Sequence, residues 1–219
     1  MKGTFITFEG IEGSGKTTQI VLLANYLKSH GVKIVLTREP GGTMIGDQIR
    51  KILLDPANKA LDPSAELLLY AASRAQHLSE VILPALAAGT IVLCDRFSDA
   101  TLAYQGYGRG LDMNMIRELD RIVTAGMRPD ITVLLDINAA TGLARARGRN
   151  NSRGLEGEAR FENEEIAFHE RVRQGYLTLA KQEPERIRVV DASPSPDRIE
   201  MEIRKIVVTV SGIAEPSLF

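Results

Sequence analysis

The chain has 219 residues, of which 44% are hydrophobic and 25% are charged, and its formal net charge is -1. This composition is typical of a single globular domain with a sizeable core and excludes a disordered or low-complexity chain. The nearly balanced charge argues against general binding to nucleic acid or to a membrane surface, so any attraction for phosphate must be local.

Strands and helices alternate along the predicted chain. Apolar, β-rich runs predict strands at 4–9, 33–37, 91–94, 131–136 and 187–190. Helical patterns lie at 17–29, 45–54, 63–88, 112–126, 139–148, 158–182 and 197–210. This alternation predicts an α/β fold with a parallel sheet covered by helices on both faces. We expect one domain over 1–219, with a polar, glycine-bearing segment at 149–157 forming a mobile loop.

Two helix starts and the cysteine content give further expectations. Asp62 before Pro63, and Ser195 before Pro196, are typical of a capping residue followed by proline at the first helical position. The single cysteine, Cys94, has no intrachain disulfide partner and fits a buried strand in a reducing cytosol. The uncharged run 81–94 is too short to span a bilayer, and no signal-peptide core precedes Glu9. We therefore expect a cytoplasmic protein.

The first predicted strand runs into the most specific motif of the chain, within "TFITFEGIEGSGKTTQI" at 4–20. It fits the pattern G-x-x-x-x-G-K-[ST], in which converging backbone N–H groups and a lysine hold phosphates and the Ser/Thr hydroxyl can bind magnesium. A helix follows at once, so the phosphates would lie at its positive end. The residues predicted to bind ATP are Gly10, Gly13, Ser14, Gly15, Lys16, Thr17 and Thr18.

A nucleotide switch of the GTPase type also contains this motif, but it needs an N-K-x-D and a D-x-x-G sequence as well. The candidate for the first, "NKALD" at 58–62, has Leu61 where the aspartate belongs. No aspartate of the chain is followed by glycine three residues later. The motif therefore indicates ATP used either for mechanical work or for phosphoryl transfer to a small acceptor.

Charged residues stand where two predicted strands end, at the sheet edge where open parallel sheets bind ligands. Asp95 can hold magnesium opposite Thr17, directly or through water. Arg96 and Arg38 offer fork-shaped donors for the phosphate of an acceptor. The alternative is a salt bridge of Asp95 with Arg96 or Arg38.

Tyr70 and Arg74 are four residues apart in a helical pattern and so share one face of that helix. An aromatic ring that stacks on a pyrimidine and a guanidinium that donates to its O4 would form a thymine site. On periodicity alone, Tyr70 fits a packed core equally well.

Four further segments carry a resemblance to a known family: "TREPGGT" at 37–43, "YAASRAQH" at 70–77, "DRFSDATLAYQG" at 95–106 and "FHERVRQGYLTLA" at 168–180. In this order after the phosphate-binding loop, they resemble the bacterial thymidylate kinases, which transfer the γ-phosphoryl group of ATP to dTMP. The resemblance covers nearly the whole chain. It implies a sheet order of 2-3-1-4-5, Mg²⁺ as cofactor, ATP and dTMP as substrates, and a homodimer joined by helices.

The resemblance also implies roles for individual residues toward the acceptor. Tyr70 matches an aromatic residue that stacks on thymine, and Thr101 lies in the base-facing position. Tyr104, which Gln105 follows, matches a tyrosine that leaves no room for a ribose 2′-hydroxyl. Glu12 matches an acid that approaches the 3′-hydroxyl.

An arginine-rich stretch between 145 and 173 is expected to contain a mobile lid at about 145–160. Alone, such a run with interleaved glutamates fits a solvated helix face. Phosphoryl transfer, however, gains rate from an arginine delivered to the transition state, and the loop itself has Gly13 after Glu12 and Lys16 as its one basic residue. The chain resembles those thymidylate kinases whose catalytic arginines lie in the lid. Because the stretch "RGRNNSRGLEGEARFE" is longer than usual, Arg149, Arg153 and Arg160 remain alternatives.

We therefore expect catalysis by Lys16, Arg96 and a lid arginine, with dTMP as acceptor. No general base is needed, because a monophosphate with a second pKa of about 6 is already largely dianionic at neutral pH. His30, His77 and His169 are expected to be surface or packing residues. The alternatives are another nucleoside monophosphate kinase and an ATP-binding regulatory module without an acceptor.

Overall fold

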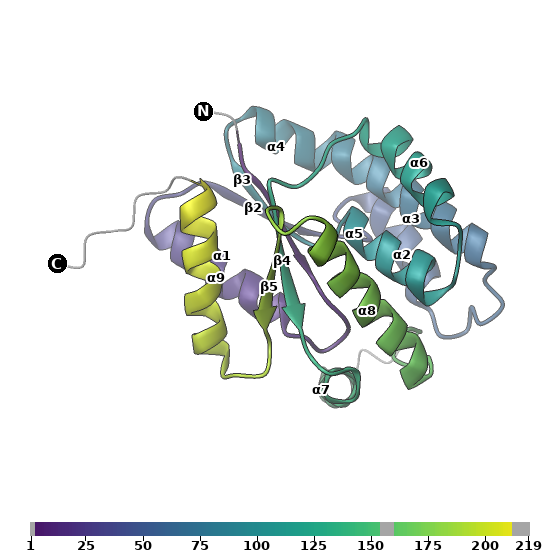
Figure 1. The fold of residues 1–219 in the computed structure, drawn as a ribbon. Helices are drawn as coiled ribbons and strands as arrows, with labels where there is room; N and C mark the ends of the chain where they lie inside the picture. The colour runs from purple at the N-terminus through teal and green to yellow at the C-terminus, as the bar shows by residue number, and fades with distance from the viewer. Residues whose placement is uncertain (1–2, 154–159, 212–219) are drawn as a thin grey trace.

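A parallel sheet forms the centre of the computed structural model, which describes residues 3–153 and 160–211 (Figure 1). Its strands are β1 (Phe5–Glu9), β2 (Ile34–Arg38), β3 (Ile91–Asp95), β4 (Ile131–Asp136) and β5 (Ile187–Asp191). They lie in the order β2-β3-β1-β4-β5, and each neighbouring pair is parallel. The predicted fold class and strand order are therefore confirmed.

Helices cover both faces of this sheet. They are α1 (Lys16–Ser29), α2 (Met44–Leu54), α3 (Pro63–His77), α4 (Leu83–Ala87), α5 (Ser98–Thr101), α6 (Met113–Thr124), α7 (Ala139–Arg153), α8 (Ile166–Gln182) and α9 (Pro196–Ser211), with the π-helical turns η1 (Leu78–Ile82) and η2 (Leu102–Gly108). In Figure 1, α1 and α9 pack together on one side, and α3, α6 and α8 lie on the other. The central strands β1 and β4 are buried on both faces, which explains their nearly continuous apolar sequences.

The helix predicted over 63–88 is interrupted. It consists of α3, the turn η1 and α4 in succession. Pro84 has no backbone N–H, so the hydrogen-bond ladder cannot continue regularly through this region, and a wider π-turn accommodates the change. The start of α3 is as predicted, because the Asp62 side chain accepts from the backbone N–H groups of Ser64 and Ala65.

Three further predictions of local structure were wrong. Residues 98–108 are helical, in α5 and η2, although no helix was expected there. Helix α7 continues to Arg153, so 149–153 is not a loop, whereas 154–159 lie outside the described residues. Helix α8 begins at Ile166 and not at 158, because turns occupy 160–163. Across residues 3–153 and 160–211, no helix has the length and apolar character needed to cross a bilayer.

Candidate active site

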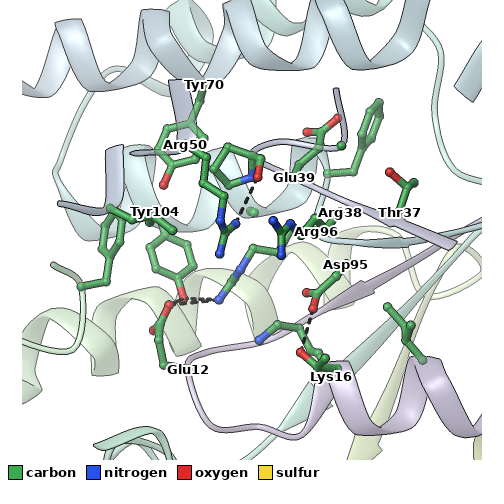
Figure 2. A pocket seen from close by; sticks show the side chains of 18 of the residues that line it. Glu12, Lys16, Thr37, Arg38, Glu39, Arg50, Tyr70, Asp95, Arg96 and Tyr104 are labelled. Carbon is green, nitrogen blue, oxygen red and sulfur yellow. Dashed lines mark hydrogen bonds and ion pairs between the residues drawn. The ribbon is translucent and has the colours of Figure 1, made fainter. Parts of the chain in front are cut away.

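A cleft of about 1070 Å³ opens where β1, β2 and β3 end. Its lining includes the phosphate-binding loop at one side and the helices α2, α3 and α5 at the other. Figure 2 shows the labelled side chains of Lys16, Glu12, Arg96, Tyr104 and Tyr70 surrounding one space. Residues expected to bind ATP and residues expected to bind an acceptor therefore meet in one cleft.

The loop between β1 and α1 has the backbone that a phosphate site requires. Gly15 precedes the helix with a φ of 94°, a conformation that glycine adopts without strain. The Lys16 ammonium group folds back and donates to the carbonyl oxygens of Gly10 and Ile11 at 3.0 and 2.8 Å. Burial and the nearby Arg96 charge lower the pKa of Lys16 to about 8. The lysine thus lies with its charge held over the loop, beside the helix N-terminus.

The same loop packs against α7. A Cβ atom on Gly13 would lie 1.9 Å from the carbonyl oxygen of Gly142, so a side chain at position 13 would collide with the backbone of that helix. The absence of an arginine at position 13 therefore has a steric reason. It also means that the phosphate-binding loop touches the helix that leads into the predicted lid.

Thr17 and Asp95 meet at the mouth of the cleft, where the Thr17 hydroxyl donates to Oδ2 of Asp95 at 3.1 Å. These oxygen ligands fit Mg²⁺, which takes one or two protein oxygens and keeps its remaining positions for water and substrate phosphates. Among the described residues, no group of three or more His, Cys, Asp or Glu side chains gathers as a metal site. The predicted metal residues are thus adjacent, and Asp95 forms no salt bridge with Arg96 or Arg38.

Arg96 follows Asp95 with a φ of 72°, a left-handed conformation that is uncommon for any residue but glycine. Its guanidinium donates from Nη1 to the Gly10 carbonyl oxygen at 3.0 Å and to the Tyr176 hydroxyl at 3.1 Å. From Nη2 it donates to Oε1 of Glu12 and to the Tyr104 hydroxyl, both at 3.0 Å. Arg96 therefore links the loop to α8 and η2.

Glu12 receives hydrogen bonds from two of the residues predicted to surround the acceptor. These are Arg96 and Tyr104, and the Tyr104 hydroxyl donates to Oε1 at 2.6 Å. On the other side, Nδ1 of the fully buried His169 lies 3.2 Å from Oε2 of Glu12. Burial opposes ionisation of Glu12, but His169, Arg96 and Lys16 together hold its pKa well below the usual range. Glu12 is thus an anion surrounded by positive charge.

The far wall of the cleft is built by α3 and α5. Arg74 is buried and donates from Nε to Glu39 and from Nη2 to the Thr101 hydroxyl, both at 2.8 Å. Its Nη1 donates to Asp120 at 3.3 Å. Each terminal nitrogen carries a second N–H that can be donated to a ligand. Tyr70, one turn earlier, lines the cleft while also packing against the hydrophobic core.

Gln105 also lines this wall, but its amide donates to the buried Glu66 at 2.8 Å. Glu66 is only 1% exposed and accepts from Arg160 and Arg109 as well. Arg160 is therefore a packed residue here. It also donates to the Leu53 carbonyl oxygen and is not among the described residues that line the cleft.

The other arginines of the predicted lid are distributed differently. Arg147, in α7, donates to the backbone carbonyl oxygen of Glu162, a residue of the cleft wall, at 3.1 Å. Arg149 and Arg153 belong to α7, but their side chains lie outside the described residues. In the described residues Arg160 thus lies outside the cleft lining, and the choice among Arg149, Arg153 and Arg160 stays a prediction.

The cleft also contains a cation that the sequence analysis did not single out. Arg50, in α2, lines the cleft and donates to the Pro40 carbonyl oxygen at 3.1 Å. In Figure 2 its guanidinium points toward Arg96, near Arg38. Arg38 is about half exposed and pairs with Asp47 at 3.7 Å. Three guanidinium groups thus converge above the phosphate-binding loop.

Comparisons with known proteins agree with this geometry. The family model for thymidylate kinase matches residues 8–203. The chain belongs to the thymidylate kinase family. It is 58% identical over 205 residues to the thymidylate kinase of Trichlorobacter lovleyi, a match that covers 94% of this chain and 97% of the relative. The thymidylate kinase of Syntrophotalea carbinolica is 60% identical over 195 residues, covering 89% and 90% of the two chains.

A solved structure supports the same assignment. The thymidylate kinase of Ehrlichia chaffeensis superposes with a TM-score of 0.76 at 36% sequence identity, covering 94% of this chain and 100% of that one. The resemblance identified from four short motifs is therefore confirmed over the whole family domain.

Sequence reasoning missed several residues that support this thymidylate kinase site. Glu39 is buried and holds both Arg74 and Nδ1 of His77, at 2.8 and 3.0 Å. Glu66 holds Gln105, and His169 contacts Glu12. Two signals were available in the sequence. Glu39 stands inside the quoted motif "TREPGGT", and Arg50 lies three residues after Asp47, which is a helical spacing. His169 gave none, since the contact joins residues far apart in sequence.

Proposed function

We propose that this chain transfers the γ-phosphoryl group of ATP to dTMP, giving ADP and dTDP. One observation carries the proposal: the phosphate-binding Lys16 and the Tyr70–Arg74 wall line a single cleft. A donor phosphate held at the loop would therefore face an acceptor whose base lies against α3. We also propose that the chain is one domain whose lid, near 145–160, closes over this cleft.

The acceptor phosphate would bind among Arg96, Arg38 and Arg50. Guanidinium groups present paired donors that match phosphate oxygens. Arg96 already bonds to the Gly10 carbonyl oxygen, so it lies next to the loop that holds the donor phosphates. A phosphate there would exchange some of the contacts that Arg96 makes with Glu12 and Tyr104.

The Glu12–Tyr104 contact supports the proposed choice of sugar. By family resemblance, Glu12 approaches the 3′-hydroxyl and Tyr104 blocks a 2′-hydroxyl. The two side chains are hydrogen-bonded at 2.6 Å, and the 2′ and 3′ positions of a sugar are likewise adjacent. The anionic Glu12 can accept from a 3′-hydroxyl, while the Tyr104 ring occupies the space beside it. We therefore propose a deoxyribonucleotide acceptor.

The base would lie between Tyr70 and the Arg74–Thr101 pair. Arg74 is fixed in place by Glu39, Thr101 and Asp120, so a remaining N–H can be aimed at the O4 of a pyrimidine at little entropic cost. Ala100 and Phe97 add apolar surface to the same wall, which suits the methyl group of thymine.

Thr17 and Asp95 are the residues that would hold Mg²⁺. When bound, the ion neutralises charge on the phosphates and orients them. Lys16 contributes a second positive charge to the transferred group once its ammonium leaves the loop carbonyls. No side chain needs to remove a proton, because the acceptor phosphate is already anionic. Lid closure would exclude water as a competing acceptor.

We further propose a homodimer formed through α2 and α3. Exposed apolar side chains run along both helices: Ile45 and Ile52 on α2, and Leu68 with Ala72 and Ala75 on α3. The spacing within each helix places these residues on one face. An apolar surface of this kind is typical of a protein–protein interface.

We also propose a cytoplasmic location. The single, buried Cys94 supports this location, because it fits a reducing compartment.

The alternatives are a kinase for UMP, CMP or AMP and an ATP-binding module without an acceptor. An assay of ADP release with ATP, Mg²⁺ and each common monophosphate distinguishes them. We expect the highest kcat/KM with dTMP, and a value about 10–200-fold lower with dUMP, because dUMP lacks one methyl group in an apolar pocket. Preference for another monophosphate would contradict the proposed acceptor, and no ADP with any of them would favour the module.

A further inference from the structure

A chain of hydrogen bonds runs from Glu9, at the end of β1, through Tyr176 of α8 to Arg96. We propose that Glu9 and Tyr176 are positioning residues that set the backbone and the guanidinium of Arg96 for binding the acceptor phosphate. The inference rests on the phosphoryl-transfer function proposed above. Glu9 and Tyr176 lie outside the phosphate-binding motif, and neither was among the residues expected to bind a substrate.

The first part of the chain acts on the backbone beside Arg96. Oε1 of Glu9 accepts from the Phe97 N–H at 2.7 Å, and the Phe8 carbonyl oxygen accepts from the Arg96 N–H at 3.0 Å. The amide groups on both sides of the Arg96 Cα are therefore held by β1. Arg96 needs this support, because a φ of 72° is unfavourable for a residue with a Cβ and persists only where the surroundings fix it.

The second part acts on the guanidinium. The Tyr176 hydroxyl has one proton, and it donates that proton to Oε2 of Glu9 at 2.7 Å. The hydroxyl oxygen must then present its lone pairs elsewhere, and Nη1 of Arg96 donates to it at 3.1 Å. Glu9 thus fixes the direction of the Tyr176 hydroxyl, which in turn fixes one edge of the guanidinium. The opposite edge, at Nη2, is held by Glu12 and Tyr104.

Glu9 makes these contacts in an unfavourable place for a charge. Its side chain is completely buried, and burial together with the Asp99 charge raises its pKa to about 7, although Arg96 and the two hydrogen bonds oppose the rise. The charged or titratable groups that face it are Asp99 from α5, Arg96, Tyr176 from α8, Lys16 from α1, Arg74 from α3 and Cys94 from β3. Only the carboxylate can accept from Phe97 and Tyr176 with both oxygens.

The test is a double-mutant cycle on kcat/KM for dTMP. Tyr176→Phe removes one hydroxyl from an otherwise unchanged ring, and Glu9→Gln keeps the shape but turns one acceptor into a donor. Each is made in the parent and in an Arg96→Ala background. Thr7→Val is the matched control, because Thr7 is a buried residue of the same strand whose hydroxyl bonds to Thr132 and not to Arg96.

We expect Tyr176→Phe to lower kcat/KM about 5–10-fold in the parent, the size of one lost hydrogen bond, and to have an effect of less than twofold when Arg96 is absent. Glu9→Gln should show the same dependence on Arg96, with most of the loss in the KM for dTMP and little in that for ATP. Thr7→Val should act equally in both backgrounds.

Losses of equal size with and without Arg96 would overturn the proposal, because a merely structural role would act through stability. Unchanged kinetics in both single variants would overturn it too. Thermal unfolding of each variant identifies any that fails to fold, and Tyr176→Phe then carries the decision. A parent protein that transfers nothing to dTMP would instead refute the proposed function.

Discussion

At the residue scale, Lys16 and Arg74 are both buried cations of the cleft, but we propose that they contact different parts of the substrates. Lys16→Ala should lower kcat by about 10²-fold or more, because it removes charge from the transferred group. Arg74→Ala should chiefly raise the KM for dTMP and reduce the preference over dCMP, since its proposed contact is to O4, where cytosine carries an amino group instead. Steady-state kinetics with both acceptors measures these effects.

Arg74 has a structural role that this comparison must separate from recognition. Its truncation leaves Glu39 without its arginine partner in the interior, which typically costs about 3–5 kcal/mol of stability. Arg109→Ala is the control, because Arg109 also pairs with a buried carboxylate, Glu66, but does not line the described cleft. A similar loss of base preference in both variants would show that the effect comes from stability.

Glu9 allows a prediction about the pH dependence of folding. Its pKa of about 7 lies above the unfolded value of 4.5, so the folded state binds more protons between these pH values. The contribution of Glu9 to the free energy of unfolding is therefore present below pH 4.5 and is lost as pH rises through 7. A shift of this size corresponds to about 3 kcal/mol.

Glutamine does not titrate, so Glu9→Gln should lack this loss. Urea unfolding of the parent and of Glu9→Gln at several pH values between 5 and 8 measures the difference in free energy of unfolding between them. We expect that difference to change in favour of the variant as pH rises. Parallel curves for the two proteins would mean that Glu9 does not have a raised pKa.

At the scale of elements, the sequence predicted strands better than helix boundaries. Buried strands have a clear apolar pattern, so all five ranges were within about one residue of the structure. The helical segment 98–108 was missed because Gly106 and Gly108 are typical of loops. Packing explains its formation: a Cβ on Gly108 would lie 2.7 Å from the Phe168 ring, so η2 approaches α8 closely through glycine.

Helix α7, which contains part of the proposed lid, carries the next prediction. If Arg149 or Arg153 acts on the transition state, its replacement by alanine should lower kcat and kcat/KM together by about 10²-fold or more and leave dTMP affinity nearly unchanged. Arg147→Ala belongs in the same series, because Arg147 contacts the backbone of the cleft residue Glu162. Single-turnover kinetics separates the chemical step from binding.

Two controls bracket this series. Arg160→Ala should act mainly on stability, because Arg160 pairs with the buried Glu66. Arg121→Ala removes an exposed pair with Glu118 and should change neither activity nor stability measurably. If Arg147, Arg149 and Arg153 all tolerate alanine within a few-fold, catalysis rests on Lys16, Arg96 and the metal.

At the scale of the whole molecule, family resemblance supplied what local patterns could not. Alternating strands and helices predict a parallel sheet, but the order β2-β3-β1-β4-β5 came from the resemblance. Local motifs also located Lys16, through the phosphate-binding pattern, and Asp95 and Arg96, because these two residues stand at the end of β3. Contacts between distant segments, such as His169 with Glu12 or Tyr176 with Glu9, depend on how α8 packs across η2 and had no local signal.

The proposed dimer is a property of the whole molecule and can be tested on its surface. Ile52 on α2 and Leu68 on α3 are 47% and 58% exposed, and these two helices pack against each other. A charge at either position would have to be buried without a partner on association, which costs several kcal/mol per ion. We therefore expect Ile52→Lys and Leu68→Lys to sediment as monomers at micromolar concentrations at which the parent sediments as a dimer.

Met201→Lys is the control, because Met201 is 53% exposed on α9, on the opposite side of the sheet (Figure 1). A parent that sediments as a monomer, or a dimer that survives both substitutions, would exclude the α2–α3 surface as the interface.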